Sequence, residues 1–402
     1  MTTSHAGTLS GSAGGDAQRQ LLFIFGFGAF MVSLDARVVA PLLPAIASEF
    51  GISTAHAGWV VSSYLLPCGF FQLLYGPLAD RLGKVTVAAG AMVVFSVLTA
   101  LSGAFSEFGT LIVLRGLTGA SAAAIIPISI AYIGDTVPYE RRQVALSRFM
   151  ATMATAHAVS TVVGGTLGEL FSWRAVFLPL GLLAGVVAAL LVLHRRRELR
   201  VTASPGKRRY ADALRAPQMV PLLLLVASEG CLFMGVFPYL SGLLEARFSL
   251  GTMAIGLLLS LSGAAQLLVA WQMPRLLRRF PESTLLASGG SAMGAAYLIA
   301  AAAPSWHWVA LSTVLIGLGF SSFHSTLQTR ATEAFPHGRA TALALFAFSL
   351  FSGSSLGSLG FAWLSGQYGY ARAFACGGVL FLVLTVATWR LLGRRLLWQP
   401  AD

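Results

Sequence analysis

The sequence predicts an all-α membrane protein in which about twelve transmembrane helices form two similar six-helix bundles. Composition gives the first indication, because 56% of the 402 residues are hydrophobic and only 10% are charged. A soluble domain carries roughly a quarter charged residues. The apolar runs are about 20 residues long and lack two-residue alternation, which favours spanning helices over a membrane β-barrel. The second half of the chain also repeats landmarks of the first half.

Each apolar run is long enough to cross ~30 Å of hydrocarbon at ~1.5 Å per residue. The runs occupy residues 21–45, 56–79, 85–105, 108–133, 143–166, 173–193, 217–242, 252–274, 283–303, 306–329, 340–363 and 371–393. They group into an N-terminal bundle (21–193) and a C-terminal bundle (217–393), joined by a basic linker (194–216). Residues 1–20 are predicted to form a disordered tail, and residues 394–402 form a second tail.

Basic residues are distributed unequally between the two sets of connections. One set contains Arg81, Lys84 and Arg339, together with a linker that holds eight Lys or Arg residues. The opposite set contains only Arg174, Arg247 and Arg372. Because basic loops stay in the cytoplasm, we expect both termini and the linker there, in a multi-pass protein of the bacterial cytoplasmic (inner) membrane. The basic residues form no aromatic–basic stripe, so the net charge of +12 does not predict nucleic-acid binding.

A shift of 198 residues matches landmarks of the two halves. The matched pairs are Gly119 with Gly317, Pro138 with Pro336, Arg141 with Arg339, Arg174 with Arg372, Asp135 with Glu333, and Arg81 with Arg279. Several matches at one offset indicate an internal duplication. Parallel six-helix repeats are a known plan of transporters, whose substrate site lies near the midplane between the halves.

The connection after the second run reads Gly76-Pro-Leu-Ala-Asp80-Arg81-Leu-Gly83-Lys84. Glycine at the first position permits close helix approach, and Gly83 permits a tight turn. Asp80 suits a cation or the positive end of a helix. This string resembles the signature loop of the major facilitator superfamily. The resemblance implies a conformational latch between the halves, formed by Gly76, Asp80, Arg81, Gly83 and Lys84.

Two further runs resemble proton-driven members of that superfamily. Arg115 lies inside the fourth run and is followed by Gly116 and Gly119, as in an arginine motif of those members. The first run places Asp35 nine residues before Pro44, which resembles the signature of drug:proton antiporters. Charged residues at this depth are expensive in lipid and mark function. We therefore predict that Asp35 and Arg115 couple transport to protons.

Two departures weaken the match to the antiporters. Arg37 stands where a threonine is common, which argues against a preference for cationic drugs. In the fifth run, Ser160 and Thr161 replace the glycine–proline pair expected four residues before Gly164 and Gly165.

The remaining polar and aromatic residues inside the runs are candidates for substrate binding. Glu229 is the strongest of them, since it lies about 12 residues, or ~18 Å, into the seventh run. The full candidate set is Glu229, Arg37, Tyr64, Gln72, His157, Phe233, Phe237, Tyr239, Gln266 and His324. Aromatic residues at helical spacing are also typical of a packed core, and a single histidine is often a packing residue.

The sequence thus predicts a proton-coupled secondary active transporter, exporting drugs or small amphipathic metabolites by alternating access. Its expected partners are the small-molecule substrate, protons and membrane lipid, and it should work as a monomer without a cofactor or metal. One alternative is uptake or facilitated diffusion of a nutrient or organic anion. Another is a membrane-embedded enzyme or sensor. We do not expect an enzyme, because the string Gly353-Ser-Ser355-Leu-Gly357 lacks the strand–turn–helix context of serine hydrolases and suits close helix packing.

Overall fold

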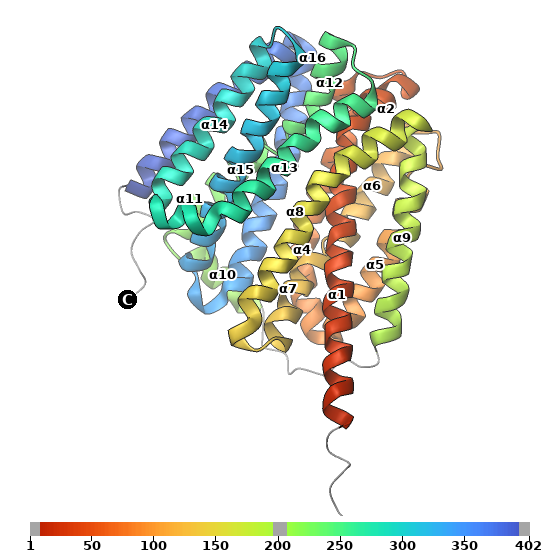
Figure 1. Cartoon of the computed structure of the whole chain (residues 1–402), viewed down its shortest axis with the longest axis vertical. Helices are drawn as coiled ribbons and strands as arrows, with labels where there is room; N and C mark the ends of the chain where they lie inside the picture. The colour runs from red at the N-terminus through yellow and green to blue at the C-terminus, as the bar shows by residue number, and fades with distance from the viewer. Residues whose placement is uncertain (1–8, 196–206, 394–402) are drawn as a thin grey trace, which may run out of the picture.

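The computed structural model describes residues 9–195 and 207–393, and every regular element in these ranges is a helix (Figure 1). The predicted all-α fold is confirmed. The first half contains α1 (Leu9–Val38), η1 (Ala40–Leu42), α2 (Leu43–Phe50), α3 (Thr54–Ala57), α4 (Trp59–Leu82), α5 (Lys84–Leu101), α6 (Phe108–Ala122), α7 (Ile125–Thr136), α8 (Tyr139–Leu170), η2 (Trp173–Val176) and α9 (Phe177–His194).

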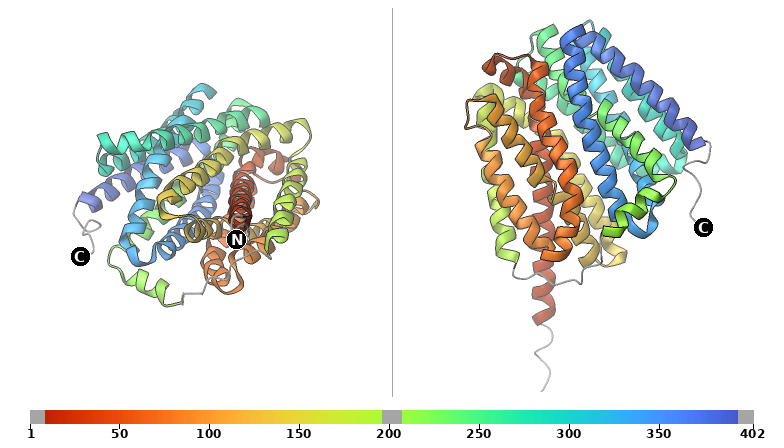
Figure 2. Two further views of the ribbon diagram at one scale, coloured as in Figure 1. Left: turned by 60° about the horizontal axis from the view of Figure 1, so that its bottom comes forward. Right: turned by 180° about the vertical axis from the view of Figure 1, so that it is seen from behind.

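The second half stands beside the first (Figure 2). It contains α10 (Lys207–Arg215), α11 (Met219–Leu232), η4 (Phe237–Tyr239), α12 (Leu240–Phe248), α13 (Thr252–Arg279), α14 (Glu282–Ala302), α15 (Trp306–Ala334), η5 (Pro336–Gly338) and α16 (Arg339–Gly393). We call the end of the bundle that holds residues 195 and 207 the linker side. The other end, which holds α2 and α12, is the opposite side (Figure 1).

Ten segments of the described ranges are long and apolar enough to cross a membrane. The last of them, Thr341–Arg390, contains a bend at Gly369 (φ 80°) and supplies both of the final two expected spans. The span expected at 143–166 is helical but is not among the ten, because α8 carries polar residues such as Thr155, His157 and Ser160. It packs between α1 and α13, where it meets protein rather than lipid on two sides.

The predicted disordered tail is wrong for residues 9–20, which form the first turns of α1. Extending an existing helix adds one hydrogen bond for each residue fixed. A polar segment next to an apolar transmembrane helix can therefore become helical as an extension of that helix. Residues 1–8, the linker residues 196–206 and the tail 394–402 lie outside the described residues. The part of the linker from Lys207 to Arg215 is helix α10.

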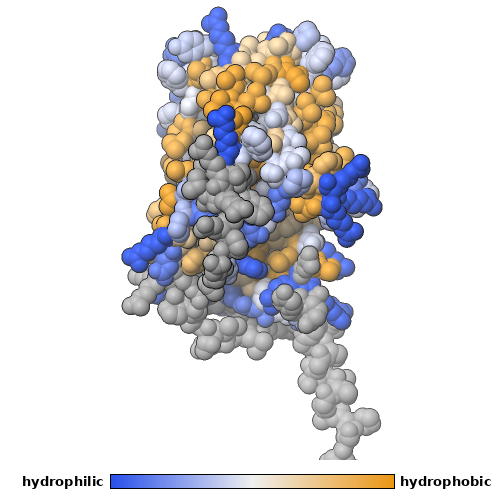
Figure 3. Space-filling model, turned by 90° about the vertical axis from the view of Figure 1, so that its left-hand side faces the viewer, coloured by the Kyte–Doolittle hydropathy of each residue, from blue (hydrophilic) through white to orange (hydrophobic). Residues whose placement is uncertain are grey.

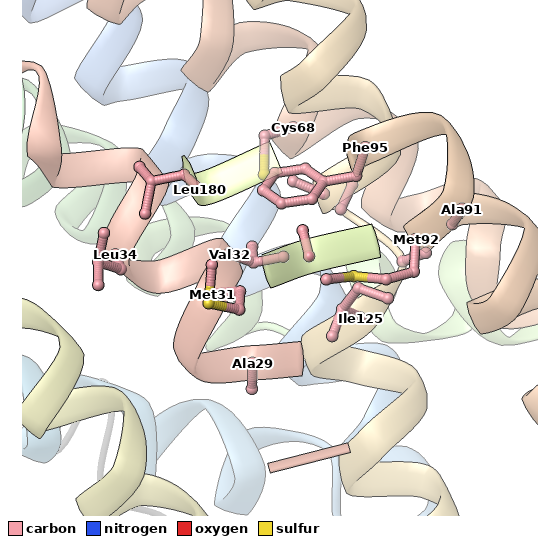
Figure 4. Packing of buried hydrophobic residues seen from close by; sticks show 14 of the residues in the cluster. Ala29, Met31, Val32, Leu34, Cys68, Ala91, Met92, Phe95, Ile125 and Leu180 are labelled. Atoms are coloured by element: carbon pink, nitrogen blue, oxygen red, sulfur yellow. The ribbon is translucent and has the colours of Figure 1, made fainter. Parts of the chain in front are cut away.

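The apolar core of the first half joins side chains from most of its helices. In Figure 4, Met31 of α1, Cys68 of α4 and Phe95 of α5 lie in one cluster with Ile125 and Leu180. Large hydrophobic side chains also cover the outside of the bundle, among them Phe23, Val113, Leu182, Leu224 and Trp271. Figure 3 shows one face of the molecule, on which hydrophobic side chains predominate in the upper part and hydrophilic side chains gather toward the lower end. Such a surface fits lipid.

Close backbone contact at glycines recurs at the same place in both halves. A Cβ atom on Gly119 of α6 would lie 2.0 Å from the carbonyl oxygen of Tyr64 in α4. A Cβ atom on Gly317 of α15 would lie 2.1 Å from the carbonyl oxygen of Ser262 in α13. Tyr64 and Ser262 are also 198 residues apart. Both residues of each contact are therefore related by the same offset as the sequence repeat.

The small-residue string in α16 has a packing role of the same kind. Added Cβ atoms on Gly353 and Gly357 would meet the carbonyl oxygens of Ala227 and Cys231 in α11 at 1.9 and 2.0 Å. Ser355, the central serine of the hydrolase-like string, is 2% exposed and donates a hydrogen bond to the carbonyl of Ser62 at 3.3 Å. These residues hold α16 against α11 and α4.

The two halves are joined at the opposite side. The hydroxyl of Tyr239, in the second half, lies 3.5 Å from the carbonyl oxygen of Ala55 in α3 of the first half. The same hydroxyl donates to the carbonyl of Ser358 within its own half, at 2.9 Å. The carboxylate of Glu169, at the end of α8, accepts a hydrogen bond from the backbone N–H of Met253 in α13 at 3.1 Å. A carboxylate at a helix N-terminus is favourable because it complements the helix dipole. These contacts close the interface between the halves at this end.

We expect Gly119→Ala to force α4 and α6 apart, since its Cβ would overlap a backbone oxygen that cannot rotate away. The loss should be about 1–3 kcal/mol, as for other overpacked cores. It should appear as a lower apparent melting temperature and a lower yield of monodisperse protein in detergent. Gly317→Ala should behave alike. Gly90→Ala is the matched control, because no atom lies within 4 Å of its added Cβ. Unchanged melting of both test variants would refute this constraint.

Candidate functional site

A cavity of about 2570 Å³ lies between the two halves. At the linker side its walls include charged residues of the loops, among them Asp80, Arg81 and Arg339. It extends toward the opposite side as far as Arg37, in the last turn of α1. The cavity is therefore accessible from the linker side and ends at the contacts that join the halves at the opposite side.

The structure brings six of the ten predicted substrate residues to the cavity wall: Arg37, Tyr64, Gln72, His157, Gln266 and His324. Phe233 and Phe237 lie one layer behind, where their rings contact the Arg37 guanidinium. Tyr239 does not line the cavity, because its hydroxyl is hydrogen-bonded to Ala55 of α3 and Ser358 of α16 in the opposite-side contact. Glu229 does not reach the cavity either, since it is 0% exposed and lies behind His324.

Asp35 and Arg115 form an ion pair inside the first half. One guanidinium nitrogen donates to both carboxylate oxygens of Asp35, at 3.1 and 2.9 Å, and another donates to the Asp35 backbone carbonyl at 3.3 Å. Both side chains are 1% exposed. The Tyr64 ring lies 4.5 Å from the guanidinium carbon and also lines the cavity, so Tyr64 connects the pair to the cavity wall.

A second buried carboxylate lies in the other half. Glu229 of α11 accepts a hydrogen bond from Nδ1 of His324 in α15, at 3.1 Å, while its second oxygen has no partner in the described structure. The His324 ring stacks on Phe320 at 4.7 Å and is 19% exposed toward the cavity. Each half therefore holds one buried carboxylate next to the cavity, bound by a basic side chain.

Arg37 differs from every other buried charge described. Its side chain is 92% buried (8% exposed), yet it makes no hydrogen bond or ion pair with any described residue. Its guanidinium carbon lies 5.6 Å from the ring centroid of Phe233 and 5.9 Å from that of Phe237. Asp35, two residues earlier on the helix, points away toward Arg115, as expected from helical geometry.

The predicted latch loop lies at the linker-side mouth of the cavity. Gly83 adopts φ 96°, a conformation suited to glycine, which confirms the predicted turn. Lys84 forms an ion pair with Asp135 of α7. Gly76 does not mediate a close approach, because the nearest atom to an added Cβ is the Tyr210 hydroxyl, at 3.9 Å.

Asp80 neither caps α5 nor forms an ion pair among the described residues. It faces Tyr210 of α10 instead. Burial, and to a lesser extent the charge of Asp80, raise the pKa of the Tyr210 phenol. The Tyr210 hydroxyl also donates to the carbonyl of Leu73 at 3.1 Å, which fixes the linker helix to α4. The signature loop thus faces the connection between the halves.

Sequence reasoning missed the apolar part of the cavity wall, which includes Met150, Met153, Phe320, Phe346 and Phe351. One signal was available in α15. Phe320, His324, Gln328 and Thr332 all line the cavity and follow each other at four-residue intervals, the spacing of one helix face. Within the described residues, no group of three His, Cys, Asp or Glu side chains is placed to hold a metal ion.

The chain matches a family model described as Major Facilitator Superfamily over residues 25–358 and 222–401. It is 26% identical to the "Uncharacterized MFS-type transporter YceJ" of Bacillus subtilis (strain 168) over 372 residues, which cover 90% of this chain and 94% of YceJ. It is 30% identical to the "Putative multidrug resistance protein MdtD" of Salmonella paratyphi A over 321 residues. That match covers 78% of this chain but only 63% of MdtD.

Solved structures show the same fold. The chain superposes on a bacterial homologue of the human lysosomal transporter Spinster, in an inward-facing and unoccupied conformation, with TM-score 0.77 and 19% identity over 96% of this chain and 99% of that one. It also superposes on the peptide transporter PepTSo, with TM-score 0.79 and 14% identity over 95% of this chain and 99% of that one.

The Asp35–Arg115 pair should be essential to stability. Arg115→Gln leaves the Asp35 carboxylate buried without its cation, a change that costs about 3–5 kcal/mol. The double variant Asp35→Asn, Arg115→Gln removes both charges and should recover part of that loss. Apparent melting temperatures in detergent measure both effects. If the single and double variants melt together, the two side chains do not interact as the structure indicates.

The latch should affect the rate of transport and not substrate binding, because Asp80 lies in the mouth and away from Arg37. We expect Asp80→Asn to lower the rate of substrate exchange across vesicle membranes several-fold, with the half-saturating concentration unchanged. Asp212→Asn on α10, an exposed carboxylate with one i,i+3 partner, is the control. A rise in half-saturating concentration at an unchanged rate would contradict this role.

Proposed function

The chain belongs to the major facilitator superfamily, and we propose that it is a proton-coupled secondary active transporter that exports drugs or small amphipathic metabolites by alternating access. The superfamily is one of transporters and is not an enzyme class. The observation that carries the proposal is the Asp35–Arg115 pair, fully buried and in contact, through Tyr64, with a cavity between the halves. Resemblance to MdtD supports export as the direction.

Proton coupling needs a carboxylate whose protonation differs between two conformations. Desolvation favours the neutral form of Asp35, and the neighbouring Arg115 favours its charged form. In this conformation the cation is in place and the carboxylate accepts two hydrogen bonds from it. A shift of α1 relative to α6 that lengthened these bonds would leave desolvation to dominate, and Asp35 would then take up a proton.

Alternating access follows from where the halves touch. They are joined at the opposite side, through Tyr239 and Glu169, while charged loops line the cavity at the linker side. With the linker in the cytoplasm, as the basic loops suggest, this is an inward-open state of a bacterial inner-membrane protein. Opening to the other side requires the contacts at Tyr239 and Glu169 to break. A single chain holds both halves, so we propose a functional monomer.

Uptake is the rival function, because the same geometry serves both directions. Accumulation in intact cells separates them. Cells that make the protein should retain less of an exported dye than control cells, and they would retain more of an imported compound.

We expect Asp35→Asn to abolish gradient-driven accumulation of a fluorescent dye in everted vesicles, by about tenfold or more, with dye exchange at equal pH retained. Asparagine keeps an acceptor for Arg115 but cannot carry the proton. Melting temperature reports whether the variant folds, and Glu229→Gln tests the other buried carboxylate in parallel. Normal uphill accumulation by folded Asp35→Asn would exclude Asp35 as the coupling residue.

A further inference from the structure

We propose that Arg37 is the anion-binding residue of the central cavity, and that the transported molecule is an amphipathic anion with an aromatic body and a carboxylate, sulfonate or phosphate group. This inference rests on the proposed function, in that it takes the cavity to be the path of the substrate. It goes further by assigning the substrate's charge.

The guanidinium of Arg37 has unused hydrogen-bonding capacity at the closed end of the cavity. It carries five N–H donors, and none meets an acceptor among the described residues. Burying an N–H donor of a charged group without an acceptor costs free energy. Two other basic side chains next to the cavity, Arg115 and His324, are each bound to a carboxylate. A third, His157, is hydrogen-bonded to Gln266. Arg37 is thus placed to bind a group that enters from the cavity.

Two features keep Arg37 charged without using its N–H groups. The faces of Phe233 and Phe237 lie within 6 Å of the guanidinium carbon, at 5.6 and 5.9 Å, where ring electrons attract a cation. Arg37 also lies in the last turn of α1, where the helix dipole favours positive charge. Its planar donor fork suits bidentate binding of carboxylate or phosphate.

No carboxylate of the deep cavity wall competes for Arg37 or would attract a cation. The acidic residues that line the cavity are Asp80 and Asp135, both at the linker-side mouth, and Asp135 is paired with Lys84. Asp35 and Glu229 are 1% and 0% exposed and already have partners. A cationic drug would therefore find no free negative charge near Arg37 in this conformation.

The aromatic part of the proposed ligand follows from the wall beside Arg37. Phe233, which contacts Arg37, stacks on Phe320 at 4.1 Å between ring centroids, and Phe320 lines the cavity. Met150, Met153 and Phe351 add apolar surface. An aromatic ring can lie on this surface while its acidic group reaches Arg37.

Three dansyl probes that differ only in head group test the proposal: dansylglycine (anionic), dansylglycinamide (neutral) and dansylaminoethyl-trimethylammonium (cationic). Each is titrated against the full-length protein in nanodiscs, and dansyl fluorescence reports binding. Dansylglycine should bind about tenfold or more tighter than the amide, the size of one charge-assisted hydrogen-bonded contact. Arg37→Gln should reduce dansylglycine affinity to that of the amide and leave the amide within about twofold.

Arg278→Gln is the matched control, since it removes the same charge from an exposed position outside the cavity and should leave all three affinities unchanged. If Arg37→Gln does not fold, Arg37→Lys serves, and it should weaken dansylglycine binding selectively because a lysine lacks the planar fork. Equal affinities of the three probes for the wild type would overturn the proposal, as would preference for the cation or the absence of binding by all three.

Binding is measured here without a proton gradient, so the two proposals fail separately. Selective anion binding without gradient-driven transport in vesicles would refute the proposed function and leave the assignment of Arg37 intact. Gradient-driven transport of neutral or cationic probes alone would refute the anion assignment and leave proton-coupled export intact.

Discussion

The structure depends on how it accommodates charge inside a bundle whose outer face is apolar. A buried ion is costly unless it is paired and hydrogen-bonded. Asp35 is bound by Arg115, Glu229 is bound by His324, and each pair joins helices of one half only. Neither pair therefore has to break when the halves move relative to one another, as the proposed alternating access requires. Arg37 is the exception among the described residues, since it is supported by aromatic rings of the other half and by no anion. Its compensation is incomplete until a ligand supplies the negative charge.

A second constraint is the distance between backbones. Within each half, glycine allows two helices to meet at a carbonyl oxygen, as at Gly119 and Gly317. The same device operates between the halves, where Gly165 of α8 faces Gly256 of α13 and an added Cβ would lie 2.9 Å from the partner Cα. At the opposite side, small residues of the first half, Ala40 and Ala55, pack in one cluster with large side chains of the second, such as Tyr239 and Leu240. Under the proposed alternating access, this contact is the one that has to open.

Much of the fold could be predicted from sequence because lipid imposes length and apolarity on every span, and duplication repeats the landmarks. Asp35 and Arg115 could be singled out because charge in an apolar run is rare, whereas depth alone does not decide whether Arg115 or Arg37 pairs with Asp35. The rotation of each helix about its axis could not be predicted, and this rotation decides whether a side chain reaches the cavity or is buried behind another side chain. Glu229 and Tyr239 were expected to line the cavity, but they lie elsewhere. Helix α8 is another example. It faces other helices and the cavity more than lipid, so its side chains need not be apolar. The helical start of the N-terminal tail reflects extension of α1, which composition does not reveal.

Asp35 and Arg37 are two residues apart in α1 but face different partners, Arg115 and the Phe233 ring. A rotation or shift of this helix end would therefore act on the proposed proton site and the proposed ligand site together. The sign of the ligand's charge then bears on direction. With the inside of the cell negative, moving one anion outward is favourable by about 2.3 kcal/mol per 100 mV, and a proton moving inward gains the same amount. Antiport of one anion against one proton therefore moves two charges down the potential, or about 4.6 kcal/mol per 100 mV. Uptake of the same anion alone would work against this potential, and its symport with one proton would move no net charge. For an anionic ligand at Arg37, the membrane potential itself favours export, and the coupled proton adds to a driving force that already points outward.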